Sequence, residues 1–118
     1  MIFLMMKRYE VYWTKEATLD LDEIVNYISK DRISAAKSIY KKIKSKCREL
    51  NTYPQRCRRV PELSDAGIDN YREIIMSPYR VIFKLTDSII YIIAVVDGRR
   101  DVETFIFDRL LRIRVLDR

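Results

Sequence analysis

Residues 71–101 read YREIIMSPYRVIFKLTDSIIYIIAVVDGRRD, and this segment is the most informative part of the chain. It contains three segments rich in β-branched and aromatic residues, separated by Ser77-Pro78 and by the polar run Thr86-Asp87-Ser88. Short runs of this kind between turn residues predict a meander of three strands. The last run, residues 89–96, is apolar throughout, which is typical of a strand that is buried on both faces.

Each of the three segments carries an arginine within the strand or just after it, at Arg72, Arg80 and Arg100. We expect these side chains to form a cationic surface on one face or rim of the sheet. The formal charge of +6, from 23 basic and 17 acidic residues, is compatible with a polyanionic partner. The chain has no histidine, so any acid–base chemistry would fall to Lys, Arg, Tyr, Asp or Glu.

Upstream of the meander, the alternation of Tyr9, Val11 and Trp13 predicts a first strand over residues 8–14. Thr14 is suited to cap a helix that runs to about Lys30. Two successive apolar stripes at helical spacing predict an αα-hairpin. The stripes consist of Ala17, Leu21, Ile24, Val25 and Ile28, and of Ala36, Ile39, Tyr40, Ile43, Cys47 and Leu50.

The second helix of this hairpin is strongly basic. One interpretation is a solvated face that complements the acidic first helix, and the alternative is a role in binding an anion. The single acidic residue beside them is Glu49, and the basic residues are Lys37, Lys41, Lys42, Lys44, Lys46 and Arg48.

After the hairpin, Arg56, Arg58 and Arg59 are expected to lie in a connector, and residues 64–70 in a loop. A final apolar stripe predicts a short C-terminal helix with Arg109 and Arg112 on its exposed side; the stripe consists of Val102, Ile106, Leu110 and Ile113. The resulting fold class is α+β: an N-terminal strand, an αα-hairpin packed on a mostly antiparallel sheet completed by a three-strand meander, and a short C-terminal helix. We expect a single domain over residues 1–118, in which residues 1–6 are a disordered or misassigned start.

Several classes of site are excluded by what the sequence lacks. Gly67 and Gly98 are isolated, so no phosphate-binding loop or dinucleotide fingerprint is present, and no cofactor is expected. Cys47 and Cys57 have no further cysteines or histidines to complete a zinc pattern. We expect two reduced thiols, one apolar and one in a loop, with a disulfide as the alternative. No segment is long enough to span a membrane, and we expect a cytoplasmic protein.

The ordered set of motifs along the chain resembles the RelE/ParE toxin superfamily. The likeness extends from about Tyr9 to Leu111. It rests on Trp13 to Ala17 with Asp20-Leu21, on Tyr53-Pro54 with Arg59 to Leu63, and on Tyr71-Arg72-Glu73, Pro78 to Phe83 and Gly98 to Asp101. The resemblance implies the toxin of a type II toxin–antitoxin module, of the kind often labelled a plasmid stabilisation protein, whose effect is growth inhibition.

Two branches of this superfamily share the fold but differ in their target. RelE-like members cut mRNA on the ribosome as endoribonucleases, whereas ParE-like members poison DNA gyrase without a nuclease site. For the nuclease branch, the resemblance implies catalytic roles for Arg72, Arg80 and Arg100. The position two residues after Arg72 is Ile74 rather than lysine, and the C-terminal aromatic is Phe105 rather than tyrosine.

This incomplete set of nuclease residues favours a ParE-like inhibitor of DNA gyrase. The alternative is a ribosome-dependent endoribonuclease in which Lys84 or Tyr79 replaces the missing groups, and a further alternative is an inactive toxin-fold partner in antitoxin autorepression. Arg80 could instead have a structural role with Glu73 or Asp101, and Arg100 one with Asp101. Tyr79 and Tyr91 are interpreted as packing residues.

The resemblance also implies a cognate antitoxin as partner, in a heterotetramer or a larger complex, with gyrase or the ribosome and its mRNA as target. Residues expected to contact a partner or a nucleic acid are Arg56, Arg58, Arg59, Lys84, Arg99 and Phe105.

Overall fold

The computed structural model describes residues 7–113, so the expectation for residues 1–6 lies outside the described part. The helices are α1 (Lys15–Ser29), α2 (Ile33–Arg48), α3 (Pro61–Ser64) and α4 (Val102–Ile113), with 3-10 turns η2 (Glu49–Asn51) and η3 (Pro54–Arg56). The strands are β1 (Glu10–Trp13), β2 (Arg58–Arg59), β3 (Tyr71–Met76), β4 (Tyr79–Leu85) and β5 (Ile89–Asp97). The order of elements confirms the predicted α+β class.

The sheet has the strand order β1-β5-β4-β3-β2. β1 is parallel to β5, and the other pairs are antiparallel, as the predicted meander requires. One prediction was wrong: Arg58 and Arg59 are not in a connector but form edge strand β2, paired with Glu73 and Arg72 of β3. A strand of two residues is too short to show an alternating pattern, so the sequence carries no signal for it.

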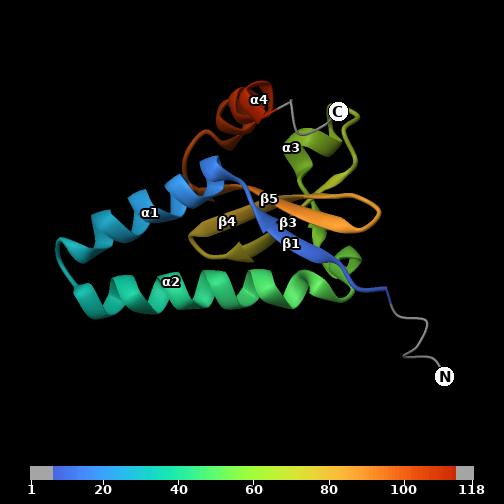
Figure 1. The fold of residues 1–118 in the computed structure, drawn as a ribbon. Coiled ribbons are helices and arrows are strands. Elements are labelled where there is room, and N and C mark those ends of the chain that lie inside the picture. The colour runs from blue at the N-terminus through green and yellow to red at the C-terminus, as the bar shows by residue number, and fades with distance from the viewer. Residues whose placement is uncertain (1–6, 114–118) are drawn as a thin grey trace.

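The sheet is covered on both faces. The α1–α2 hairpin lies on one face, and α3 and α4 lie on the other (Figure 1). The other face or rim of the sheet was expected to carry Arg72, Arg80 and Arg100; this holds for Arg80 but is wrong for Arg72, which lies on the face under the hairpin. The side of the sheet that faces α4 is an apolar core that includes Val60, Leu63, Ile82 and Ile106.

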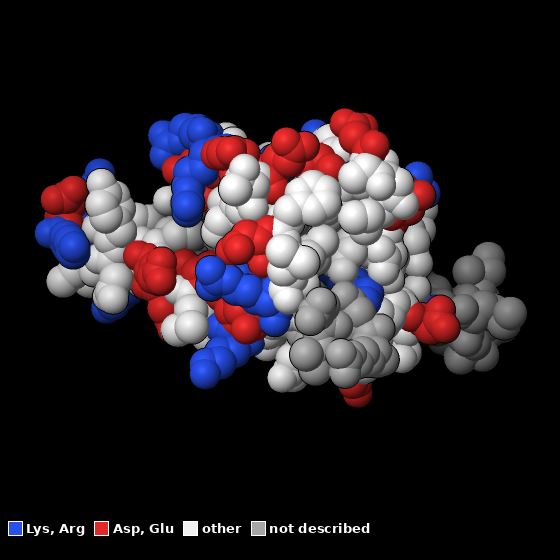
Figure 2. All heavy atoms as spheres, turned by 90° about the horizontal axis from the view of Figure 1, so that it is seen from above, with Lys and Arg blue, Asp and Glu red and all other residues white. Residues whose placement is uncertain are grey.

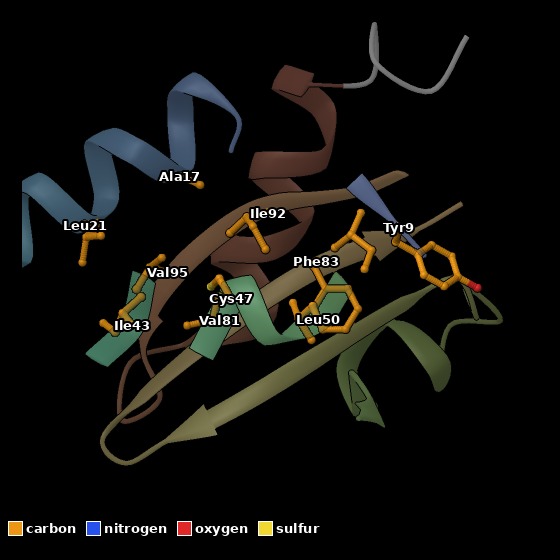
Figure 3. Close-up of a cluster of buried hydrophobic side chains, with 11 residues drawn as sticks. Tyr9, Ala17, Leu21, Ile43, Cys47, Leu50, Val81, Phe83, Ile92 and Val95 are labelled. Atoms are coloured by element: carbon orange, nitrogen blue, oxygen red, sulfur yellow. The ribbon is translucent and has the colours of Figure 1, made fainter. Parts of the chain in front are cut away.

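The hairpin is positioned by its first turn and by its apolar stripe. The Thr14 hydroxyl accepts a hydrogen bond from the Ala17 amide, so Thr14 caps α1 as predicted. The same hydroxyl donates to the carbonyl of Ile92 in β5 at 2.8 Å, which ties the start of α1 to the sheet. Figure 3 shows side chains of both helices and of the sheet converging in one cluster, among them Leu21, Ile43 and Val95.

β5 contributes to both cores, which confirms that it is buried on both faces. Ile92 and Val95 belong to the cluster under the hairpin, and Ile93 and Val96 to the cluster under α4. A register shift between Ile82 and Phe83 of β4 changes the alternation within the pair.

The two cysteines are reduced thiols, as the sequence analysis favoured. Cys47 is buried, Cys57 is half-buried in the loop before β2, and both are free thiols. Burial raises the pKa of Cys47 to about 12 and also raises the pKa of Cys57. No helix among residues 7–113 has both the length and the apolar character needed to cross a bilayer.

Candidate functional site

Arg80 is the centre of an ion-pair network on the α4 face of the sheet. The register pairs Glu73 with Ile82 and Arg80 with Ile75, so the four side chains share this face. Arg80 donates from Nε to Glu73 Oε1 at 2.7 Å and from Nη2 to Glu73 Oε2 at 3.1 Å. This confirms the structural role in which Arg80 is partnered with Glu73, whereas the alternative partner Asp101 is not used.

Two further residues complete the network. Glu62 of α3 accepts from both Nη atoms of Arg80, at 2.9 and 2.7 Å. Arg58 of β2 donates from Nε to Glu73 Oε2 at 2.6 Å. The Glu73 side chain is fully buried, and its charge is compensated by two guanidinium groups. Hydrogen bonds from Arg80 lower the pKa of Glu62, and hydrogen bonds to both carboxylates raise that of Arg80.

The turn after β5 fixes the stem of Arg80. Gly98 donates its amide to the Pro78 carbonyl at 2.7 Å. A Cβ at position 98 would lie 3.0 Å from Arg80 Cδ and 3.1 Å from the Pro78 oxygen. A larger residue at position 98 would therefore force the Arg80 side chain or the Pro78 backbone to shift by a few tenths of an ångström.

Arg72 does not share a surface with Arg80. The register pairs Arg72 with Phe83, whose side chain belongs to the cluster under the hairpin. Arg72 donates from Nη1 to the Cys57 carbonyl at 2.6 Å and thereby anchors the chain before β2. Its cross-strand neighbour is Arg59, which is exposed. Arg72 and Arg80, which were predicted to belong to one cationic surface, thus lie on opposite faces of the sheet.

Arg100 lies where β5 leads into α4. Its guanidinium carbon is 5.3 Å from the centre of the Phe105 ring. The alternative in which Arg100 pairs with Asp101 is not observed; the Asp101 carboxylate accepts hydrogen bonds from the amide and the hydroxyl of Thr104 in the first turn of α4. The neighbouring Arg99 is exposed and paired with Asp97, and this pairing lowers the pKa of Asp97 to about 2.

A groove of about 480 Å³ opens between α1, the C-terminal end of β5 and the first turn of α4. Its wall contains both charged and apolar groups. The acidic and basic members are Asp20, Glu23, Asp97, Arg99 and Arg100, and the others are Ile24, Tyr27, Tyr79, Val95, Val96 and Phe105. Tyr27 is 76% exposed, which is unusual for so large a side chain.

One member of this wall belongs to a clamp that the sequence did not reveal. Asp20 of α1 accepts the Val95 amide at 3.0 Å and both Nη atoms of Arg109 at 2.7 Å. Arg109 also donates to the Ile93 carbonyl at 2.8 Å, and its guanidinium packs on Phe105. Asp20 and Arg109 thus supply hydrogen-bond partners for backbone groups of β5 that lie beyond the residues paired with β1. The pair also joins α1 to α4.

Arg109 was expected on the exposed side of the C-terminal helix, and this is wrong, since its side chain is 11% exposed. The partners Asp20 and Arg109 are 89 residues apart, so local periodicity could not indicate that they meet. Arg112 is exposed as predicted and pairs with Asp108.

The remaining predicted contact residues are spread over the sheet. Arg56 and Arg59 are exposed near strand β2, and Lys84 is half-buried in β4. Tyr91 packs edge-on against Tyr12 with ring centres 5.7 Å apart, as expected of a packing residue. Figure 2 shows acidic and basic side chains interspersed over the face that carries α4, so the continuous cationic surface expected there is not present.

Comparison with known proteins identifies the family of this chain. Residues 11–102 match a family described as the ParE toxin of the type II toxin-antitoxin system, parDE. A solved structure titled "Chromosomal ParDE TA system from P. aeruginosa" is similar in fold, with a TM-score of 0.62 and 18% sequence identity. The likeness covers 76% of this chain and 96% of that one. No curated protein gave a significant match.

The five-stranded α+β architecture agrees with this match, which extends from β1 to the start of α4. Since the match spans well over half of the 118 residues, the chain belongs to the ParE toxin family of type II toxin–antitoxin systems, within the RelE/ParE superfamily.

Proposed function

We propose that this protein is a growth-arresting toxin that inhibits DNA gyrase and is neutralised by a cognate antitoxin. The observation that carries the proposal is the ParE family match over residues 11–102. Because the fold is shared with ribosome-dependent nucleases, the choice of target depends on the side chains rather than on the architecture.

The side chains favour the gyrase branch. Arg80, the strand arginine expected of a nuclease, makes four hydrogen bonds to Glu62 and Glu73. These bonds use four of the five guanidinium N–H donors, and the Arg80 side chain is only 11% exposed, so a phosphorane at Arg80 would have to compete with the two carboxylates. Arg72 lies on the opposite face, and Ile74 and Phe105 replace the missing lysine and tyrosine.

One observation keeps the nuclease alternative open to experiment. Among the described residues, Arg100 is exposed at the groove and is not part of an ion pair, so it could contact a phosphate. It has no acid or base of near-neutral pKa beside it, since the chain contains no histidine. We therefore assign Arg100 a contact role rather than a catalytic one.

The antitoxin is proposed to occupy the groove between α1 and α4. Tyr27, Tyr79 and Phe105 offer apolar area for a segment that folds on binding, and Arg99 and Arg100 offer charge for its acidic residues. A fall in the association rate with added salt would support this charge complementarity. A salt-independent rate would count against it.

The target is tested by two assays on the same purified protein, one measuring gyrase supercoiling and the other mRNA cleavage on programmed ribosomes. Loss of supercoiling with intact mRNA is the expected result. Cut mRNA with unaffected gyrase would establish the endoribonuclease instead. If neither assay shows an effect and cells grow normally on induced expression, the remaining interpretation is an inactive toxin-fold partner in antitoxin autorepression.

A further inference from the structure

Helix α2 carries a row of cations along one flank. Lys37, Lys41, Lys44 and Arg48 are spaced four, three and four residues apart. At about 100° and 1.5 Å per residue, the four side chains fall within an arc of about 60° and extend over about 17 Å. We call these four residues the α2 cation row.

The α2 cation row is not neutralised by the rest of the described chain. Lys37, Lys41 and Arg48 are exposed, and none of the four is in an ion pair among residues 7–113. Helix α2 contains no acidic residue, and Glu49, just beyond it, pairs with Lys46 on a different flank. No ion pair joins α1 to α2, so the interpretation of the basic face as a complement to acidic α1 has no contact to support it.

One member of the row is held in place by aromatic rings. The Lys44 ammonium lies 4.3 Å from the centre of the Trp13 ring and 6.0 Å from that of Tyr40. Cation–π contacts of this kind keep the charge and restrict the side chain. They also occupy one face of the Trp13 ring.

We propose that the α2 cation row binds the phosphate backbone of double-stranded DNA without sequence preference. A straight row of cations on a convex helix surface matches the regular array of charges on a duplex. Three of the four cations are lysines, which contact phosphates as point charges, and α2 contains no Asn or Gln to recognise base edges. The groove between α1 and α4, which could accept an unpaired base, is not lined by any residue of α2.

DNA binding by this row is independent of the proposed action on gyrase. It can be measured with the full chain and a short fluorescent duplex of arbitrary sequence, by anisotropy at salt concentrations between about 50 and 200 mM. With four phosphate contacts, the logarithm of the association constant should fall with the logarithm of salt with a slope of about −3.6.

Two double variants that lose the same charge distinguish an effect of the α2 cation row from an effect of net charge. K37Q/K41Q removes two members of the row, and the slope should become shallower by about 1.8, with weaker binding. K42Q/K46Q removes two lysines from outside the row and should leave the slope and the affinity nearly unchanged. The gyrase assay on the same proteins shows whether target inhibition survives the loss of DNA binding.

Equal effects of the two double variants would overturn the proposal, because net charge alone would then explain binding. No binding of the duplex at low salt would overturn it as well. An unlabelled acidic peptide can also be added as a competitor. If it displaces the fluorescent duplex as strongly as unlabelled duplex of equal total charge does, the α2 cation row binds an acidic protein partner instead.

Discussion

Arg80 and Glu73 lie on neighbouring strands and share two hydrogen bonds, of 2.7 and 3.1 Å, on a face of the sheet that helices α3 and α4 cover. The same guanidinium holds Glu62 of α3. Arg80, for which the resemblance to the nuclease branch implies a catalytic role, thus links β4, β3 and α3. This relationship makes stability, rather than toxicity alone, the first property that Arg80 variants should change.

Arg80→Met should destabilise the fold by about 3–5 kcal/mol, because it leaves the buried Glu73 carboxylate with only Arg58 as a cationic partner. Urea unfolding measures this loss. The paired variant Glu73→Leu/Arg80→Met should recover part of it, since no uncompensated charge remains at Glu73. A double variant less stable than Arg80→Met would contradict this explanation.

Gly98→Ala should cost about 1–3 kcal/mol, because the new methyl group meets Arg80 Cδ and the Pro78 carbonyl oxygen at 3.0 and 3.1 Å. Urea unfolding again provides the measurement. In the Arg80→Ala background the cost should be smaller, since the side-chain half of the clash is removed. Equal costs in the two backgrounds would mean that Arg80 does not set the size limit at position 98.

Asp20→Asn should loosen the clamp over the end of β5. The carboxylate accepts the Val95 amide and two hydrogen bonds from Arg109, so its neutralisation should cost about 2–3 kcal/mol. Hydrogen exchange at the Val95 amide should accelerate more than that at amides of β3. Asp22→Asn, at an exposed position of the same helix, is the control and should change neither measurement.

Stability should decrease as acid is added. Arg80 lowers the pKa of Glu62 from 4.5, and Arg99 lowers that of Asp97 from 3.8 to about 2. Because each carboxyl binds protons more weakly when folded than when unfolded, their contributions are complete above the unfolded pKa and disappear as the pH falls through the folded one. Unfolding midpoints should therefore decline between about pH 5 and pH 2.

Between about pH 6 and pH 8 the same midpoints should be nearly constant, since the chain has no histidine to titrate there. A pronounced slope in that range would point to a titrating group that these ion pairs do not include. Arg80→Met should reduce the acid sensitivity, because it removes the largest cause of the lowered pKa of Glu62.

Local sequence patterns were sufficient to predict most of the fold but little of the candidate site. Periodicity located the hairpin and the meander, and Thr14 was recognised as a cap because capping depends on residues three positions apart. The Asp20–Arg109 clamp depends on residues 89 positions apart, and Glu62 meets Arg80 only after α3 packs on the sheet. The division of Arg72 and Arg80 between two faces depends on register, which the sequence did not specify.

The double variant Arg72→Ala/Arg100→Ala tests whether these two arginines have a catalytic role. If the two arginines are not part of a nuclease site, the folded double variant should retain inhibition of gyrase within a few-fold of the unmodified protein. Circular dichroism provides the control for folding, because Arg72 also holds the Cys57 carbonyl. Cleavage of ribosome-bound mRNA by the unmodified protein that is lost in the folded double variant would support a catalytic role.

The proposed action on gyrase is tested by measuring the amount of cleaved DNA that is trapped covalently on gyrase as purified toxin is added. We predict a rise in trapped cleavage complexes that saturates with toxin and is abolished by the antitoxin, while ribosome-bound mRNA stays intact. Unchanged cleavage complexes and supercoiling, together with codon-periodic cuts in mRNA, would contradict it.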